Sequence, residues 1–545
     1  MKNILFLLAS IVVLNASAQQ KQSPKLVVGI VVDQMCYDYL YRYSGKFSKG
    51  GFKRLMKNGA NCRNTHYNYV PTYTGPGHAS IYTGTTPANH GIVANDWIDR
   101  LSGASVNCVQ DDQMKTVGST STGGQCSPHF LKTHTVTDQL KMTYPTAKVI
   151  SMSIKDRGAI LPAGHLSDGS YWYDYSSGQF ITSSFFKSDL PSWVKQFNET
   201  NYVKASMEKT WEPLLSIEQY TESQPDNSPY EQRIGGKTSP TFPYNLKEMS
   251  KVVSPFELFT VTPFSNTYLA DFALRSITAE NLGQDNQTDM LCVSFSTPDI
   301  AGHAFGPYSV EIEDIYLRLD LEIERMLNYL DKEIGKKDYV FFVTADHAVV
   351  PVPQHLVDQK LPGGYFYLND RLNSLRKSIS QAFGADLFIG EDNLNIYLDR
   401  PKMDSLGIFP REVQLFVADV IRNWDGVKAV YTADELLSFS VDEEWKDMIK
   451  NGYDYKRSGD VIFILESGYL PKSVESEASK RGTSHGSAFN YDTQVPLLWY
   501  GKQIKPQSIH RRIEITDIAA TLSQLFFIQR NGSMTGQPII ELLQD

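Results

Sequence analysis

Short runs of consecutive apolar residues recur along the chain, and they predict strands that are buried on both faces. The first run covers residues 27–32 and is rich in valine and isoleucine, as in the interior strands of parallel sheets. The pattern predicts several central strands spread over almost the whole chain, because comparable runs follow at 148–153, 291–295, 340–344, 461–465 and 495–500.

Helical spacing occurs between several of these strands, most clearly at 311–335. Apolar residues recur there every three or four positions, at Ile315, Leu319, Ile323, Met326 and Leu330. We expect this helix to pack its apolar face in the core. Strands that alternate with helices predict an α/β fold, in which a mostly parallel central sheet is covered by helices on both faces.

Two stretches interrupt this alternation. Residues from about 165 to 250 are rich in Ser, Tyr, Pro, Trp and Asn and lack a clean period, and residues 355–480 have short helices and strands of their own. Both keep aromatic and apolar residues, which linkers lack. We therefore predict a core formed by 19–354 and 481–545, with an irregular excursion at 165–250 and an inserted subdomain at 355–480.

The first residues are typical of an export signal. Lys2 precedes an apolar segment at 4–14 that is too short to span a bilayer, and Ala-Ser-Ala at 16–18 forms a cleavage site. A membrane anchor is the alternative, but no lipobox cysteine follows. We expect residues 1–18 to be removed as a signal peptide and the protein to be periplasmic or secreted. No later apolar window predicts a membrane span.

Composition and charge restrict the classes of partner. The chain has 545 residues, of which 41% are hydrophobic and 21% charged, as in an ordinary globular protein. Its formal net charge is −9 and it has no basic stripe, so we expect no specific nucleic-acid partner. A phosphate-bearing substrate would need local positive charge from metal ions or a few side chains. We expect a monomer.

Five cysteines are present, so at least one stays unpaired in an exported chain. Cys292 lies inside an apolar run and is expected to be a buried, unreactive thiol. Cys108 and Cys126 flank a polar loop and could form a disulfide. No CxxC motif occurs, so the cysteines do not predict a metal site.

Acidic and histidine side chains follow the predicted strands, at the edge where open α/β sheets bind ligands. Six of them form the candidate metal site: Asp33, Asp299, His303, Asp346, His347 and His485. The i, i+4 spacing of Asp299 and His303 places both on one face of a helical turn. A lone Asp after a strand is more often a helix cap, but together these six form an N/O ligand set suited to zinc. Six ligands predict two Zn²⁺ ions about 4 Å apart.

A candidate nucleophile lies in the turn and predicted helix start at 71–80. Thr74 would lie where free backbone N–H groups and the positive end of the helix dipole attract anions. The alternative is that Thr74 only caps the helix. Thr72, Ser80 and Thr83 are competing hydroxyls, and the residues alone leave this choice open.

These segments together resemble the alkaline phosphatase superfamily, in order and along nearly the whole mature chain. The resemblance rests on the segments 31–33, 74–78, 91–96, 299–303, 344–347 and His485, with 516–522 similar to that superfamily's C-terminal helix. Residues 153–165 are similar to the phosphate-irrepressible (PafA-type) alkaline phosphatases, in which a Lys and an Arg two positions apart contact the phosphoryl oxygens. Lys155 and Arg157 match that pair. Related nucleotide pyrophosphatase/phosphodiesterases lack it.

The resemblance implies a role for each site residue. Asp299, His303 and His485 would hold one zinc ion. Asp33, Asp346 and His347 would hold the other, together with the Thr74 oxygen. Asn95, Lys155 and Arg157 would contact the phosphoryl oxygens. Asp156 and His165 lie close in sequence and are interpreted as structural, since the ligand set is already complete.

The expected function is broad-specificity hydrolysis of small-molecule phosphate monoesters through a phosphothreonine at Thr74. A monoester carries nearly two negative charges, which two zinc ions, a Lys and an Arg would offset. The alternatives are a phosphodiesterase or nucleotide pyrophosphatase of the same superfamily, and a non-catalytic phosphoester- or glycan-binding protein. A sulfatase is disfavoured because the formylglycine signal is absent around Thr74.

Overall fold

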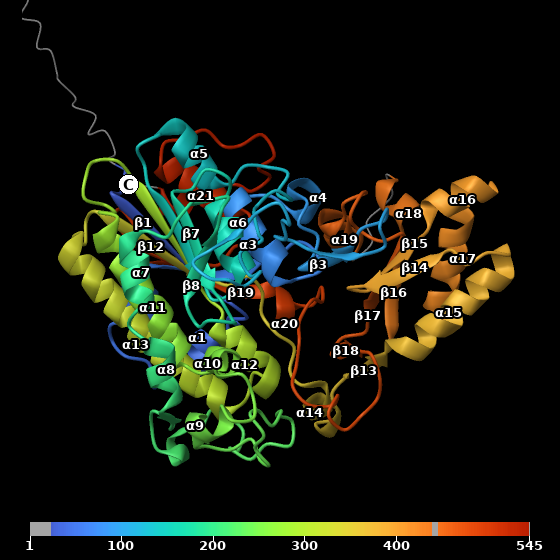
Figure 1. The fold of residues 1–545 in the computed structure, drawn as a ribbon, viewed down its shortest axis with the longest axis horizontal. Helices are drawn as coiled ribbons and strands as arrows, with labels where there is room; N and C mark the ends of the chain where they lie inside the picture. The colour runs from blue at the N-terminus through green and yellow to red at the C-terminus, as the bar shows by residue number, and fades with distance from the viewer. Residues whose placement is uncertain (1–22, 439–444, 544–545) are drawn as a thin grey trace, which may run out of the picture.

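One large sheet organises the protein (Figure 1). The computed structural model describes residues 23–438 and 445–543, so the predicted signal peptide lies outside the described residues. Within them, eleven strands follow the order β20-β2-β19-β12-β1-β11-β6-β7-β8-β5, with β21 paired to β2. The strands are β1 (Leu26–Val32), β2 (Ala60–His66), β5 (Thr116–Val117), β6 (Val149–Ser153), β7 (Gly169–Tyr173), β8 (Phe180–Ser183), β11 (Asp289–Phe295), β12 (Tyr339–Thr344), β19 (Gln494–Gly501), β20 (Gln507–Ile509) and β21 (Ile513–Glu514).

The centre of this sheet is parallel, as predicted. Strand β1 pairs in parallel with β11 and β12, β11 with β6, and β6 with β7. Every residue of β1 is buried, which agrees with its sequence LVVGIVV. The flanks differ, because β19 is antiparallel to both β12 and β2, and β8 is antiparallel to β7. A buried apolar run carries no information on strand direction.

Helices cover both faces of the sheet, which confirms the predicted fold class (Figure 1). One group packs through α6 on β6 and β7, and the other packs through α11 on β6 and β11. The first group is α3 (Thr74–Thr83), α5 (Val136–Thr143), α6 (Asp156–Ala163) and α21 (Asp517–Leu525); the second includes α11 (Phe264–Ala279), α12 (Thr297–Phe305) and α13 (Val310–Glu333).

The predicted helix at 311–335 corresponds to α13. Its apolar stripe is buried, and its start is set by Ser309, whose hydroxyl accepts a hydrogen bond from the Ile312 N–H. The helix ends at Glu333, before Gly335, which has a positive φ of 98°. The boundaries therefore differ from the prediction by one or two residues.

The predicted excursion at 165–250 needs a correction at its beginning. Strands β7 and β8 lie there, and both belong to the central sheet. Beyond them the chain forms α7 (Ser192–Asn198), α8 (Tyr202–Met207) and the two-stranded pair β9 (Thr210–Trp211) and β10 (Tyr244–Asn245). Strand β7 contains the aromatic residues Tyr171 and Trp172, which obscured its periodic pattern in the sequence. Both are buried.

The segment 355–480 contains a separate four-stranded sheet with its own apolar core, to the right in Figure 1. Strand β17, predicted at 461–465, lies in this sheet and not in the central one, and it is antiparallel to both neighbours. The separate core supports the predicted subdomain, whose boundaries stay a prediction. The sheet consists of β14 (Phe388–Asp392), β15 (Asn395–Leu398), β17 (Val461–Leu465) and β16 (Val427–Thr432), flanked by α15 (Leu368–Phe383), α16 (Arg400–Leu406), α17 (Pro410–Arg422) and α19 (Lys446–Gly452).

The cysteines are free thiols in the part of the chain that the structure describes, including Cys108 and Cys126, so the disulfide considered for that pair does not form there. Cys292 is buried as expected, and burial raises the pKa of its thiol to about 12. No helix among residues 23–438 and 445–543 is both long and apolar enough to cross a bilayer.

Candidate active site

The candidate site lies at the carboxyl edge of the central parallel strands. Strand β1 lies between β11 and β12, and Val31 is in register with both Ser294 and Thr344. The residues that follow these three strands therefore leave the sheet side by side. This register brings Asp33, Asp346 and the first turn of α12 together, although Asp33 lies more than 250 residues before the other two in sequence.

Asp299 lies between two histidines. Its Oδ1 atom is 3.2 Å from His303 Nε2 and 3.5 Å from His485 Nε2. The Nδ1 atoms of these rings face backbone carbonyls, that of His303 at Thr483 and that of His485 at Thr72. A carbonyl oxygen beside Nδ1 keeps the ring proton on that nitrogen and leaves a free lone pair on Nε2. Metal-binding histidines are oriented in this way.

Asp33, Asp346 and His347 form the second group, and all three are fully buried. The His347 Nε2 atom is 3.4 Å from Asp33 Oδ1 and 3.8 Å from Asp346 Oδ2. These three atoms have no hydrogen-bond partner within the described residues. Burying a polar atom without a hydrogen-bond partner costs free energy. Because these three atoms converge, a cation between them would compensate that cost.

The predicted division of ligands between two ions is only partly matched by the distances. Among the described residues, two compact groups could hold an ion: Asp33, Asp346 and His347, and Asp299, His347 and His485. His347 and His485 stack with ring centroids 3.5 Å apart, so His347 is near both groups. The His303 side chain is 37% exposed and lies at the rim, in contact with Asp299. The assignment of His303 as a ligand stays a prediction.

Negative charge is concentrated here. Burial raises the pKa of Asp33 well above its usual value, and the nearby carboxylates of Asp299 and Asp346 raise it further. Burial also lowers the pKa of His347 to about 3, so its imidazole is neutral and can donate a lone pair. Three acidic side chains beside the neutral His347 imidazole are an environment that a divalent metal stabilises.

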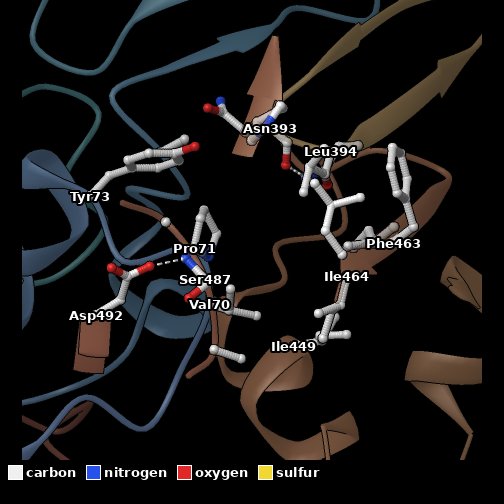
Figure 2. A pocket seen from close by; sticks show the side chains of 18 of the residues that line it. Val70, Pro71, Tyr73, Asn393, Leu394, Ile449, Phe463, Ile464, Ser487 and Asp492 are labelled. Atoms are coloured by element: carbon white, nitrogen blue, oxygen red, sulfur yellow. Dashed lines mark hydrogen bonds between the residues drawn. The ribbon is translucent and has the colours of Figure 1, made fainter. Parts of the chain in front are cut away.

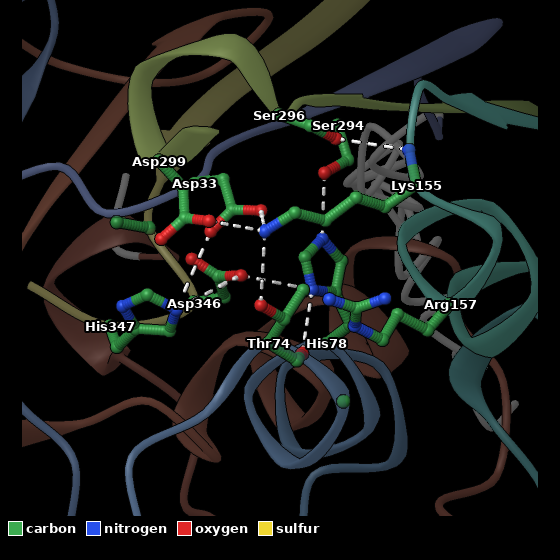
Figure 3. Close-up of polar contacts among 12 residues, drawn as sticks. Asp33, Thr74, His78, Lys155, Arg157, Ser294, Ser296, Asp299, Asp346 and His347 are labelled. Carbon is green, nitrogen blue, oxygen red and sulfur yellow. Dashed lines mark hydrogen bonds and ion pairs between the residues drawn. The ribbon is translucent and has the colours of Figure 1, made fainter. Parts of the chain in front are cut away.

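Thr74 is the first residue of α3, and Tyr73 occupies the capping position, so Thr74 is not the N-cap. Its Oγ1 atom is 3.4 Å from Lys155 Nζ, inside the carboxylate cluster (Figure 3). The competing hydroxyls are used elsewhere: Thr72 donates to Ser487 O, Thr83 to Ala79 O, and Ser80 bonds to Tyr69 and His90. Of the four candidates, Thr74 is therefore the one beside the predicted ligands.

Lys155 is buried and directed into the site. Its Nζ atom is 2.7 Å from Asp33 Oδ2 and 2.5 Å from Asp299 Oδ2. A surface ion-pair role is therefore excluded for this residue. Lys155 caps α6 directly after β6, the strand next to β11, which explains how it reaches the carboxylates.

Arg157 and Asn95 border the same space. The Arg157 Nη1 atom is 3.5 Å from Asp156 Oδ1, while its Nε is buried with no hydrogen-bond partner among the described residues. The Asn95 Oδ1 atom accepts a hydrogen bond from the Gly75 N–H at 2.8 Å, so the NH₂ group of Asn95 points away from that N–H. His165 contacts Asp138, in agreement with a structural role.

The sequence reasoning missed two supporting residues, His78 and Gln34. His78 bonds through Nδ1 to Thr74 O at 2.8 Å and through Nε2 to Ser294 Oγ, and its Nδ1 is 3.3 Å from Asp346 Oδ2. Gln34 Nε2 donates to Asp299 Oδ1 at 2.6 Å. His78 lies four residues after Thr74 on a buried helix, a spacing that could have suggested its role. Gln34 carried no comparable signal.

Comparison with known proteins shows which family the chain resembles. Residues 27–488 match the type I phosphodiesterase / nucleotide pyrophosphatase family. The chain is 41% identical to alkaline phosphatase PafA of Elizabethkingia meningoseptica over 95% of this chain and 94% of that protein. It is 40% identical to alkaline phosphatase PhoV of Synechococcus elongatus over 97% of each. Its fold matches the crystal structure of wild-type PafA with a TM-score of 0.91, over 96% of this chain and 99% of that one.

These matches cover nearly the whole chain and confirm the predicted resemblance to PafA-type alkaline phosphatases. The chain therefore belongs to the type I phosphodiesterase / nucleotide pyrophosphatase family.

Proposed function

We propose that this protein hydrolyses phosphate monoesters with two zinc ions and a phosphothreonine at Thr74. The observation that carries the proposal is the convergence of buried carboxylates, histidine Nε2 atoms, Lys155 and the Thr74 hydroxyl at one sheet edge. The alkaline phosphatase relatives support the same class of substrate.

The predicted ligands are Asp299, His303 and His485 for one ion, and Asp33, Asp346 and His347 with the Thr74 oxygen for the other. Their unpaired buried atoms and carbonyl-oriented rings suit Zn²⁺. When bound, the ions would supply positive charge and lower the pKa of oxygen nucleophiles.

The side chains of this protein then orient the reaction. Thr74 Oγ1 attacks phosphorus, the P–O bond to the alcohol breaks, and the alcohol leaves with a proton. Water then attacks the phosphothreonine, which releases inorganic phosphate and restores the Thr74 hydroxyl. His78 would position Thr74 through its hydrogen bond to the Thr74 carbonyl oxygen.

Lys155, Arg157 and Asn95 would hold the phosphoryl oxygens. Lys155 is already beside Thr74 Oγ1, and Arg157 keeps an unpaired Nε. A monoester offers three non-bridging oxygens and the larger charge, whereas a diester offers two. The pair should therefore favour monoesters. A phosphodiesterase is the second candidate, because the matching family carries that description.

We also propose export to the periplasm or medium and a monomeric state. Export rests on the signal-like sequence of residues 1–18.

The test compares a phosphate monoester with a matched diester, using zinc-loaded wild type and the double variant Lys155→Ala, Arg157→Ala. Each lost charge-assisted hydrogen bond should cost about 1.5–3 kcal/mol, or roughly ten- to a hundredfold in monoester kcat/KM. Diester turnover should fall much less. An equal loss on both substrates, or a wild type that prefers the diester, would favour the phosphodiesterase. Zinc content is measured in parallel, because Lys155 contacts two predicted ligands.

A further inference from the structure

A cavity opens between the core and the 355–480 segment (Figure 2). The space between its walls, including the part that is open to solvent, is about 870 Å³. Apolar side chains dominate its walls, among them Val70, Pro71, Leu394, Ile449 and Ile464. None of these residues has a role in the proposed chemistry.

The inner end of this cavity meets the candidate active site. Tyr73 and His485 line it, and their rings are 5.3 Å apart in an edge-on arrangement. Tyr73 directly precedes Thr74, and His485 Nε2 is 3.5 Å from Asp299 Oδ1. A substrate whose phosphorus lies at Thr74 can therefore extend its organic part past Tyr73 into the cavity.

The outer wall comes from the hairpin between β14 and β15. Its turn contains Asn393 and Leu394, which have positive φ angles of 54° and 59°. The Asn393 Nδ2 atom donates to Asp96 O at 3.0 Å, which attaches the turn beside Asn95. The 355–480 segment thus supplies a fixed wall next to the phosphoryl-binding residues.

The charge of the cavity is one-sided. Three carboxylates line it, those of Asp392, Glu466 and Asp492, and no Lys or Arg does so in the described part of the chain. Asp492 Oδ2 accepts a hydrogen bond from the Ser487 N–H at 2.7 Å, so its charge is partly compensated. An anionic group on the organic part of a substrate would be repelled here, whereas a neutral apolar ring would be accommodated.

We propose that this cavity binds the alcohol part of the substrate and selects phosphate monoesters of apolar, aromatic alcohols that carry no negative charge. The proposal rests on the proposed function, which places the phosphoryl group at Thr74. It names a substrate class that the phosphoryl-binding residues alone do not define.

The charge selection is tested with 3-(carboxymethyl)phenyl phosphate and its neutral methyl ester, whose leaving groups have similar basicity. Wild type should prefer the ester in kcat/KM by about tenfold, the effect of roughly 1.4 kcal/mol of repulsion. Asp392→Asn should reduce this ratio by about threefold or more. Asp404→Asn, an exposed change on α16, should leave it unchanged. A ratio near one in wild type would overturn the selection by charge.

The apolar wall is tested with 2-naphthyl and phenyl phosphate. Leu394→Ala should lower kcat/KM for the naphthyl ester about tenfold more than for the phenyl ester, because it removes buried contact area. The control is Leu406→Ala, which alters a leucine that is 51% exposed on α16. Inhibition by inorganic phosphate should stay the same in both variants, since phosphate needs only the phosphoryl site.

The experiments distinguish a failure of the cavity assignment from a failure of the proposed function. Hydrolysis of all four monoesters with ratios that neither variant changes would overturn the cavity assignment alone. If no monoester is hydrolysed, calorimetric measurement of 2-naphthol binding still tests whether the cavity binds an aromatic alcohol. Binding to wild type that Leu394→Ala weakens would support it, and binding to neither would refute it.

Discussion

The hydroxyl of Thr74 differs from its neighbours in what surrounds it. Thr72, Ser80 and Thr83 are all buried and hydrogen-bonded within the core, whereas Thr74 Oγ1 faces the Lys155 ammonium group and the carboxylates behind it. Its backbone N–H lies in the first turn of α3, where unpaired donors attract an anion. A nucleophile needs both features at one position.

Thr74→Ala should therefore reduce monoester turnover by about a thousandfold or more, because the attacking oxygen is lost. Thr74→Ser should retain substantial activity, since the hydroxyl survives. Steady-state kinetics with ³²P-labelled substrate and acid quench would show labelled protein in wild type and none in Thr74→Ala. Thr72→Ala serves as the control. Full loss of activity there, with Thr74→Ala still active, would contradict the assignment.

At the scale of elements, the site depends on how closely α3 approaches the loop after β12. Gly77 lies in the first turns of α3, and a Cβ atom added there would lie 2.3 Å from the Asp346 carbonyl oxygen and 2.7 Å from its Cβ. The helix can bring Thr74 up to Asp346 only because this position has no side chain. His78, the next residue, then reaches both Thr74 and Asp346.

Gly77→Ala should displace α3 from Asp346, lower zinc content and reduce activity at least tenfold, while destabilising the protein by about 1–3 kcal/mol. Thermal unfolding, metal analysis and kinetics measure the three effects. Gly45→Ala is the matched control, because a Cβ at Gly45 meets nothing within 4 Å. Normal zinc content and activity in Gly77→Ala would show that this close contact is not required.

At the scale of the whole molecule, the site joins segments from both ends of the chain. Asp33 directly follows β1 and His485 precedes β19, and in the central sheet only β12 lies between these two strands. Burial and repulsion from Asp299 and Asp346 oppose the ionisation of Asp33, and Lys155 compensates only part of this cost. Ions that bind the folded chain would stabilise all of these segments together.

Removing metal with a chelator at neutral pH should therefore lower Tm by roughly 5 °C or more, and added Zn²⁺ should restore it. Metal analysis should find about two zinc ions per chain. His485→Ala should reduce the zinc-induced rise in Tm, while His510→Ala, at an exposed position, should not. A Tm that the chelator leaves unchanged, or one ion with full activity, would contradict the two-zinc site.

The sequence by itself determined the features that local pattern encodes. Buried strands appear in the sequence as runs rich in valine and isoleucine. The polar residues that follow these strands are expected at one sheet edge, because the carboxyl ends of parallel strands lie at the same edge. Asp33, Asp299 and Asp346 could therefore be identified as one cluster before any coordinates. The helix predicted at 311–335 and observed at 310–333 followed from its 3.6-residue period.

Only the tertiary structure decided the features that depend on contacts between distant segments. It distinguished Thr74 from Thr72 as the candidate nucleophile, because the Thr72 hydroxyl donates a hydrogen bond to the carbonyl oxygen of Ser487, 415 residues away. It assigned β17 to a second sheet and made β19 antiparallel, since a buried apolar run is the same in either direction. The cavity likewise arises where the β14–β15 hairpin meets Asp96, and no local pattern in either segment records that contact.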